Sequence, residues 1–369
     1  NWLIFLGAAC LFGLSFYSYH APRIFLPLLV LVCSYIFREE LLKFPKKVLA
    51  ATIIIFVLTI APLVIFLPKE AITQRLQSSS GSLQEKNIAD SAALRSQDTG
   101  ALSSKISALH SKKALLLISY FSNYVAHFDP NFLFAKGDDN FRHHIENMGM
   151  FYLFDLPLVL FGLYYFAKNR TKVSALLFFW IILSPIPAIP ASPAPHAIRS
   201  FQLVVPMLFL SAFAFTKLFK NKNLIGRIIY LSASVVVVAS FLIYLHNYYV
   251  HYKIDKAREW QYGYSEAAVI SNELKGDYDR VLVSSNLEQA YIFWLFATKY
   301  DPKTYQQTGN ATHFDKFYFG QEATQKSGEL FISIPAKPDE LAPSFPKNYK
   351  VVSKIRYPDG ATAVKLGRP

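Results

Sequence analysis

A short polar cluster at residues 138–144 holds the densest set of chemically competent side chains: Asp138, Asn140, Arg142, His143 and His144. Carboxylate, amide, guanidinium and imidazole groups together suit the recognition of a sugar or a phosphate. Histidine and aspartate also bind metal ions, but this spacing matches no standard metal site, so we expect none here. A solvated loop is the alternative interpretation.

A second pair, His196 and Arg199, follows a run of five prolines between residues 185 and 195. Prolines at this density cannot continue a helix. Irregular backbone at membrane depth is tolerated only where protein or a water-filled cavity surrounds it. We therefore interpret the segment as a cavity rim that presents His196 and Arg199 to an anionic ligand. A rigid external turn with an interfacial arginine is the alternative.

Three further candidates lie near the ends of apolar segments. His20 and Arg23 stand at the start of one segment, where a guanidinium can grip a phosphate or extend to the lipid headgroups. Asp155 lies several residues inside another segment. Because a charge at that depth is costly without a partner, we expect Asp155 to form a salt bridge with Arg23 or Arg199. Binding of substrate is the alternative role for Asp155.

The composition places these residues in a membrane protein. Of 369 residues, 53% are hydrophobic and only 17% are charged, and the apolar residues form long uncharged runs. This excludes a soluble globular enzyme and a disordered chain. The net charge of +13 does not indicate nucleic-acid binding, because three short basic loops carry +9 of it. The two cysteines lie inside apolar runs, which argues against a disulfide scaffold.

Apolar segments of about membrane-spanning length recur seven times: 1–17, 21–37, 48–68, 148–167, 173–192, 201–216 and 228–247. The basic loops 38–47, 168–172 and 217–227 belong on the cytoplasmic side by the positive-inside rule. We predict an α-helical polytopic protein of the plasma (inner) membrane with an extracytoplasmic C-terminal α/β domain. The predicted parts are spans in 1–68, a long external loop in 69–147, spans in 148–247 and the external domain in 248–369.

The two large external parts have different expected structures. In the loop, residues 77–113 are interpreted as flexible or as a short amphipathic helix, and the aromatic stretch 114–147 as lying at the membrane interface. In the tail, the pattern predicts helices at 263–275 and 287–299. It also predicts strands at 280–284 and 330–334, and a hairpin of 350–356 with 361–366.

Several stretches together resemble the membrane glycosyltransferases of the GT-C fold, and among them the bacterial protein-mannosyltransferase and aminoarabinose-transferase group. In order, they are YSYHAPRIFLPLL (17–29), HFDPNFLFAKGDDNFRHH (127–144), GMFYLFDLPLVLFGL (149–163), SPIPAIPASPAPHAIRS (184–200), WQYGY (260–264) and IFWLFATKYDP (292–302). The resemblance covers most of the chain in a consistent order.

This resemblance implies transfer of a sugar from a polyprenyl-phosphate donor to an acceptor protein, lipid or glycan on the outer face. Arginine and histidine at headgroup depth would stabilise the charge of the lipid-phosphate leaving group. The family's general base is an acidic residue after the first span. We expect that residue upstream of Asn1, in a longer protein of which this chain is the C-terminal part, so no catalytic residue is assigned and this part alone should be inactive. Many members also require a divalent cation, whose ligands the sequence does not place.

Two other functions stay open. An enzyme similar to O-antigen polymerases or ligases would share the long external loop and the arginines, although such proteins usually lack a C-terminal α/β domain. A transporter or accessory membrane protein is the non-catalytic alternative. Transporters often show repeated halves and polar breaks near mid-span. Here the charged groups lie toward the outer ends of the spans, and no repeat is found.

Overall fold

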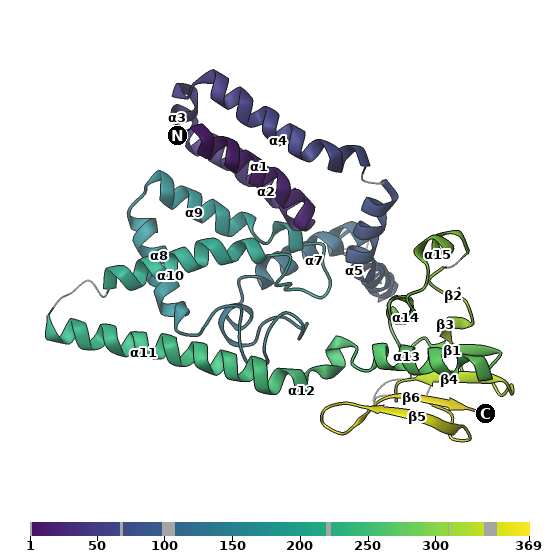
Figure 1. Cartoon of the computed structure of the whole chain (residues 1–369). Helices are drawn as coiled ribbons and strands as arrows, with labels where there is room; N and C mark the ends of the chain where they lie inside the picture. The colour runs from purple at the N-terminus through teal and green to yellow at the C-terminus, as the bar shows by residue number, and fades with distance from the viewer. Residues whose placement is uncertain (1, 67–68, 98–107, 219–222, 309, 336–344) are drawn as a thin grey trace. The chain divides into compact units, whose positions relative to one another are not determined.

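The computed structural model describes residues 2–66, 69–97, 108–218, 223–308, 310–335 and 345–369 (Figure 1). The chain forms two compact units, Asn1–Leu242 and Ile243–Pro369. Part of the segment interpreted as flexible or amphipathic, 98–107, and part of the basic loop, 219–222, lie outside the described residues.

The first unit is helical. Its longer helices are α1 (Trp2–Ser18), α2 (Ala21–Ile36), α3 (Arg38–Lys43), α4 (Lys46–Phe66), α5 (Lys69–Gln97), α7 (Lys112–Ala126), α8 (Asp155–Lys168), α9 (Lys172–Leu183), α10 (Val204–Leu218) and α11 (Leu224–His246), which continues into the second unit. Short helical turns lie between them: the π-helical η1 (Asn131–Ala135) and the 3₁₀ turns η2 (Ile186–Ala188) and η3 (Phe201–Leu203).

Among the described residues, three helical stretches are long and apolar enough to cross a membrane: Lys46–Phe66, Phe201–Leu218 and Leu224–Asp255. Neither α4 nor α11 has a buried residue. Apolar helices that bury so little of their surface within the protein are stable in lipid and not in water. The apolar helices Trp2–Ser18, Ala21–Ile36 and Lys172–Ala188 are shorter. The chain is therefore a membrane-associated, mostly helical protein.

Helices α1 and α4 lie side by side (Figure 1). Glycine at position 13 lets the two helices approach closely at Thr59, because a Cβ at Gly13 would lie 2.6 Å from the Thr59 side chain. The Tyr17 hydroxyl donates to the Thr59 carbonyl at 2.7 Å and accepts the Leu63 N–H at 3.2 Å. Pro62 breaks the hydrogen-bond ladder of α4 in this turn, and Tyr17 satisfies the backbone groups beside it.

The core of the first unit lies where α8 crosses α10. A Cβ at Gly162 would lie 2.9 Å from the Leu210 carbonyl oxygen, so glycine lets the two helices approach closely. Phe132, Leu133 and Phe134 of η1 are buried in this core. Three apolar side chains of the aromatic stretch thus fill the space between helices, and the location of the stretch at the membrane interface stays a prediction. Leu117 and Phe121 of α7, by contrast, are exposed.

Two expectations about helix extent are corrected. Residues 77–97 belong to the 29-residue helix α5, which is neither flexible nor short. The fourth apolar segment becomes helical only at Asp155. Residues 148–154 before it are irregular, and the Asp155 carboxylate accepts the Tyr152 N–H at 3.2 Å.

The second unit is a six-stranded mixed sheet with helices on one face. Its strands are β1 (Arg280–Ser284), β2 (His313–Phe314), β3 (Phe317–Gln321), β4 (Glu329–Ser333), β5 (Lys350–Arg356) and β6 (Thr362–Arg368), in the order β2-β3-β1-β4-β6-β5. Strand β1 is parallel to β3 and β4, and the other pairs are antiparallel. Its helical elements are η4 (Asn247–Tyr252), α12 (Lys253–Asp255), η5 (Ala257–Trp260), α13 (Tyr264–Leu274), η6 (Lys275–Asp277), α14 (Ala290–Thr298) and α15 (Pro302–Thr308).

The side chains of β1 alternate between two hydrophobic layers. Val281 and Val283 pack with Trp294 of α14 in the larger core, and Leu282 packs on the opposite face with Phe331 and others. Burial on both faces is typical of a central parallel strand. The predicted helices, strands and hairpin of the tail are confirmed within a few residues. The sequence analysis missed β2, β3 and α15, because residues 300–329 lack a sustained period.

Candidate functional site

Helix α7 presents one row of polar side chains to the proline-rich loop 184–200. The Asn123 side-chain amide donates to the carbonyls of Ile189 and Ala191 at 2.9 and 3.0 Å. The Tyr124 hydroxyl donates to the Ile182 carbonyl at 3.0 Å, in the last turn of α9 just before this loop. The peptide bonds Ser192–Pro193 and Ala194–Pro195 are cis. Because proline has no N–H, Pro193 and Pro195 cannot bond the carbonyls of Ile189 and Ala191 four residues earlier, and the Asn123 amide supplies these bonds instead.

His127, at the end of α7, completes this row. Its ring is fully buried, its Nδ1 donates to the Asn123 carbonyl at 2.7 Å, and its Nε2 accepts the His196 N–H at 3.0 Å. The two bonds require the neutral tautomer with the proton on Nδ1. Burial lowers the pKa of His127 below its usual value, which agrees with a neutral ring.

Asp138 joins the polar cluster to the proline-rich loop. Its Oδ2 accepts the His143 Nδ1–H at 2.6 Å and the Ala197 N–H at 2.9 Å, and its Oδ1 accepts the Asn140 N–H at 3.1 Å. Burial by itself raises the pKa of the Asp138 carboxyl, but the bonds from His143 and the two backbone N–H groups outweigh burial and lower it. The carboxylate is therefore ionised and held by three donors.

The turn that delivers Asp138 depends on Gly137. Its φ is +79°, in the left-handed region, and an added Cβ would lie 2.6 Å from the ring of His144. The His144 ring in turn lies between two carbonyl oxygens, with Nδ1 at 2.9 Å from Ile145 and Nε2 at 2.7 Å from Asp138. Gly137 and His144 thus set the backbone position from which Asp138 reaches the proline-rich loop.

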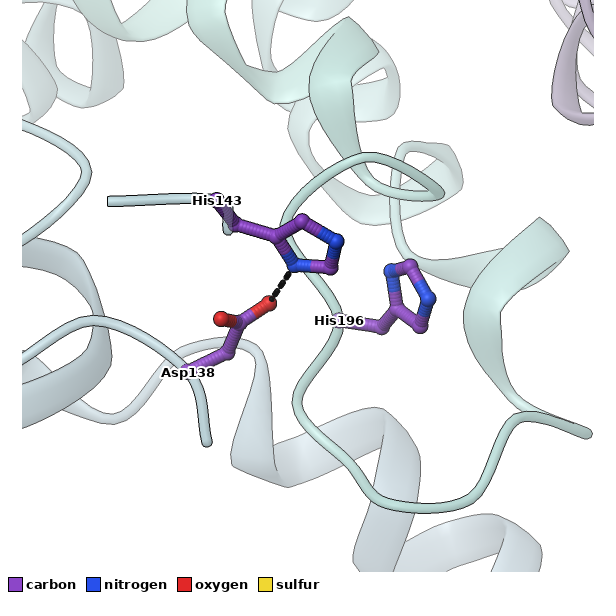
Figure 2. Close-up of side chains that lie close together, drawn as sticks. All are labelled: Asp138, His143 and His196. Carbon is purple, nitrogen blue, oxygen red and sulfur yellow. Dashed lines mark hydrogen bonds and ion pairs between the residues drawn. The ribbon is translucent and has the colours of Figure 1, made fainter. Parts of the chain in front are cut away.

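His143 and His196 face each other beside Asp138 (Figure 2). Their ring centroids are 4.9 Å apart at an interplanar angle of 39°. The Nε2 of His143 accepts from the Asn140 side-chain amide at 3.2 Å, which leaves its Nδ1–H for Asp138. We call His127, Asp138, His143 and His196 the histidine–aspartate network.

His196 is the most strongly perturbed member of the network. Burial, with the positive charge of Arg199 as the next cause, lowers the pKa of His196 from 6.5 to about 4. The ring is therefore neutral at physiological pH, with a lone pair on one nitrogen. Perturbed titratable groups held together by a charge partner are typical of functional sites as well as of structural networks.

The geometry offers two kinds of chemistry. The Asp138 carboxylate fixes the tautomer and the orientation of the His143 ring, as in acid–base pairs. Asp138, His143 and His196 also place one candidate metal-ligand atom each within 4.8 Å of the others. Arg199 adds a cation next to these groups, so the site suits an anionic ligand.

The structure thus brings together five of the residues singled out from the sequence: Asp138, Asn140, His143, His196 and Arg199. The exposed Arg142 belongs to the same loop and is linked through its backbone N–H to the Asn140 side chain at 3.1 Å.

The remaining candidates make other contacts. Arg23 donates through Nε to the Phe16 carbonyl at 2.9 Å, so it satisfies the end of α1, and the His20 ring packs against the Tyr19 ring at an interplanar angle of 41°. The expected salt bridge of Asp155 with an arginine was wrong: its carboxylate accepts from the Ser211 hydroxyl of α10 and from the Tyr152 N–H. The Ser211 hydroxyl, on the neighbouring helix α10, supplies the hydrogen bond that the buried Asp155 carboxylate requires.

Sequence reasoning missed His127, Asn123 and Ser211. His127 and Asn123 are four residues apart, which places them on one face of α7. An aspartate near the start of an apolar helix also signals a polar partner on a packed helix. Neither signal identifies the partner, because the partners lie 56 to 69 residues away in the chain.

Comparison of the chain with protein-family models, with curated proteins and with solved structures finds no match. The resemblance to GT-C glycosyltransferases therefore rests on the sequence stretches that carry it.

Proposed function

We propose that the protein is a membrane glycosyltransferase of the GT-C type. It moves a sugar from a polyprenyl-phosphate donor to an acceptor protein, lipid or glycan on the outer face of the plasma (inner) membrane. In this proposal the chain crosses the membrane seven times, and the sheet unit and the histidine–aspartate network lie outside. A bound divalent cation belongs to the proposal as well.

Contacts between loops support the proposed topology. Lys172, in a loop assigned to the cytoplasm from its charge, pairs with Glu40 of another such loop at 2.7 Å. Residues 138–144 and 193–200, both assigned to the outside, meet through the bond from the Ala197 N–H to Asp138. An exposed ion pair contributes little stability. It is nonetheless a geometric marker that two segments lie at the same end of a helix bundle.

The contact between residues 138–144 and residues 193–200 is the observation that carries the proposal. Two loops that the sequence marked separately as anion-binding share one buried network beside Arg199. Buried polar groups next to apolar helices are costly unless they are bonded or bind a ligand. A phosphate held near Arg199 would gain charge-assisted hydrogen bonds at headgroup depth, where the leaving group of a lipid-linked sugar develops its negative charge.

The proposal is tested by binding of the lipid product. The chain in nanodiscs is titrated with polyprenyl monophosphate and, as the uncharged control, with the matching polyprenol. We expect a clear preference for the phosphate that Arg199→Ala reduces by about tenfold to a hundredfold, since a charged hydrogen bond contributes about 1.5–3 kcal/mol. The matched control Arg170→Ala, on a loop assigned to the cytoplasm, should bind as the wild type does. Equal binding of both lipids, or an equal loss in both variants, would contradict the proposal.

Chemical labelling tests the topology independently. In a chain with Cys10 and Cys33 replaced by alanine, one cysteine is placed at the exposed position Asp139 and, in a second variant, at the exposed position Arg170. A membrane-impermeant maleimide added to intact cells should label position 139 and spare position 170. Labelling of position 170 from outside would overturn the assignment of sides.

A further inference from the structure

The two imidazoles of the histidine–aspartate network have the arrangement of a partly built metal site. The Nδ1 of His196 is buried and has no hydrogen-bond partner among the described residues. A buried ring nitrogen without a partner is unfavourable relative to one that is bonded. In Figure 2 a ring nitrogen of His196 and the nitrogen of His143 that does not contact Asp138 are turned toward each other. An ion between the rings would satisfy both nitrogens.

Asp138 supplies the support that metal-binding histidines need. Ligating histidines almost always donate their other ring N–H to a carboxylate or carbonyl, which fixes the tautomer and the orientation of the ring. His143 donates its Nδ1–H to Asp138 at 2.6 Å, so its Nε2 is the nitrogen with the lone pair. The carboxylate is itself held by the backbone N–H groups of Ala197 and Asn140. The ring of His143 is therefore already oriented.

We propose that His143 and His196 bind one divalent transition-metal ion of the zinc class, with Asp138 orienting His143. Imidazole nitrogens favour zinc and related ions, whereas magnesium and calcium prefer oxygen ligands. The candidate ligand atoms of the three residues lie within 4.8 Å of one another. Two nitrogen ligands of a tetrahedral zinc ion are ~3.4 Å apart, which lies inside this 4.8 Å limit. Because the Asn140 amide bonds the Nε2 of His143, it must turn away when the ion binds.

Two protein ligands leave coordination positions for oxygen ligands. If the proposed function holds, an oxygen of the lipid phosphate takes one of these positions beside Arg199, and the ion neutralises part of the phosphate charge. Metal binding itself does not depend on that function.

The test measures metal bound to the chain directly. The protein is purified with a tag that contains no histidine, in a His251→Ala background. This background removes the exposed pair of His246 and His251, whose Nε2 atoms are 3.2 Å apart and could bind metal by themselves. After incubation with Zn²⁺ and removal of excess metal, elemental analysis should give about one zinc per chain. His143→Ala and His196→Ala should each lower the content at least tenfold, and Asp138→Asn should weaken zinc affinity by about tenfold to a hundredfold. His313→Ala, a histidine of the sheet unit, is the matched control and should leave the content unchanged.

A second measurement does not depend on how the histidine variants fold. Co²⁺ added to the metal-free His251→Ala chain should give the visible absorption of a low-coordinate cobalt site, and added Zn²⁺ should abolish it. Absence of bound zinc and of the cobalt spectrum, or zinc content unchanged by both histidine replacements, would overturn the proposal. Zinc binding without any preference for polyprenyl phosphate over polyprenol would instead retain the metal site and remove the proposed function.

Discussion

Replacement of His127 tests whether α7 holds the proline-rich loop in place. His127→Leu keeps a buried apolar side chain but leaves the His196 N–H without its acceptor. A buried N–H without a partner costs about 1–3 kcal/mol. With about 2 kcal/mol lost, the open form of the loop becomes about 30 times more populated. Hydrogen exchange measured by mass spectrometry on peptides covering residues 189–203 should therefore accelerate about 30-fold at the His196 amide.

The matched variant His127→Gln separates this hydrogen bond from general damage to packing. The glutamine oxygen can reach the position of Nε2 and accept the same N–H, so the His196 amide should exchange close to the wild-type rate. Peptides of the sheet unit serve as an internal reference and should be unaffected in both variants. Equal acceleration in His127→Leu and His127→Gln would refute the reasoning, as would unchanged exchange in both.

Three further predictions concern the same region. Gly137→Ala should lower the midpoint of thermal unfolding, because a left-handed φ costs about 1–2 kcal/mol for a residue with a Cβ and the methyl group meets His144; an unchanged midpoint would show that the turn adapts. Ser211→Ala should lower the free energy of unfolding by about 1.5–3 kcal/mol, since it removes a hydrogen-bond donor from the buried Asp155 carboxylate. In the same melting assay Ser211→Thr, which keeps the hydroxyl, should recover part of this stability. With a chelator present, the free energy of unfolding should fall as the pH drops from 6.5 toward 4, because the unfolded chain binds a proton on residue 196 that the folded chain does not bind until the pH nears 4. Melts of His196→Gln across this range should show a shallower dependence, and an equal slope would exclude His196 as the cause.

The sequence alone determined the features that depend on neighbours along the chain. Apolar runs identify helices suited to lipid, because the cost of burying backbone groups in hydrocarbon is met within one helix. The proline series marks the end of α9 for an equally local reason, since proline lacks an N–H and blocks the next helical turn. The strand β1 follows from its short apolar run rich in β-branched residues, and the hairpin of β5 and β6 follows from the turn residues Asp359 and Gly360 between two strand-forming segments.

Only the tertiary structure decided which polar groups meet. His127 and the His196 N–H are 69 residues apart, and Asp138 and the Ala197 N–H are 59 apart. Asp155 meets a serine 56 residues away instead of the expected arginine. Each of these pairings requires helices to pack within a few ångströms, which depends on side-chain volumes across the whole core and on close contacts such as Gly162 against Leu210. Residue types and spacing identify groups that need a partner, but packing selects the partner, because a hydrogen bond forms only between groups that the fold has already brought within about 3 Å.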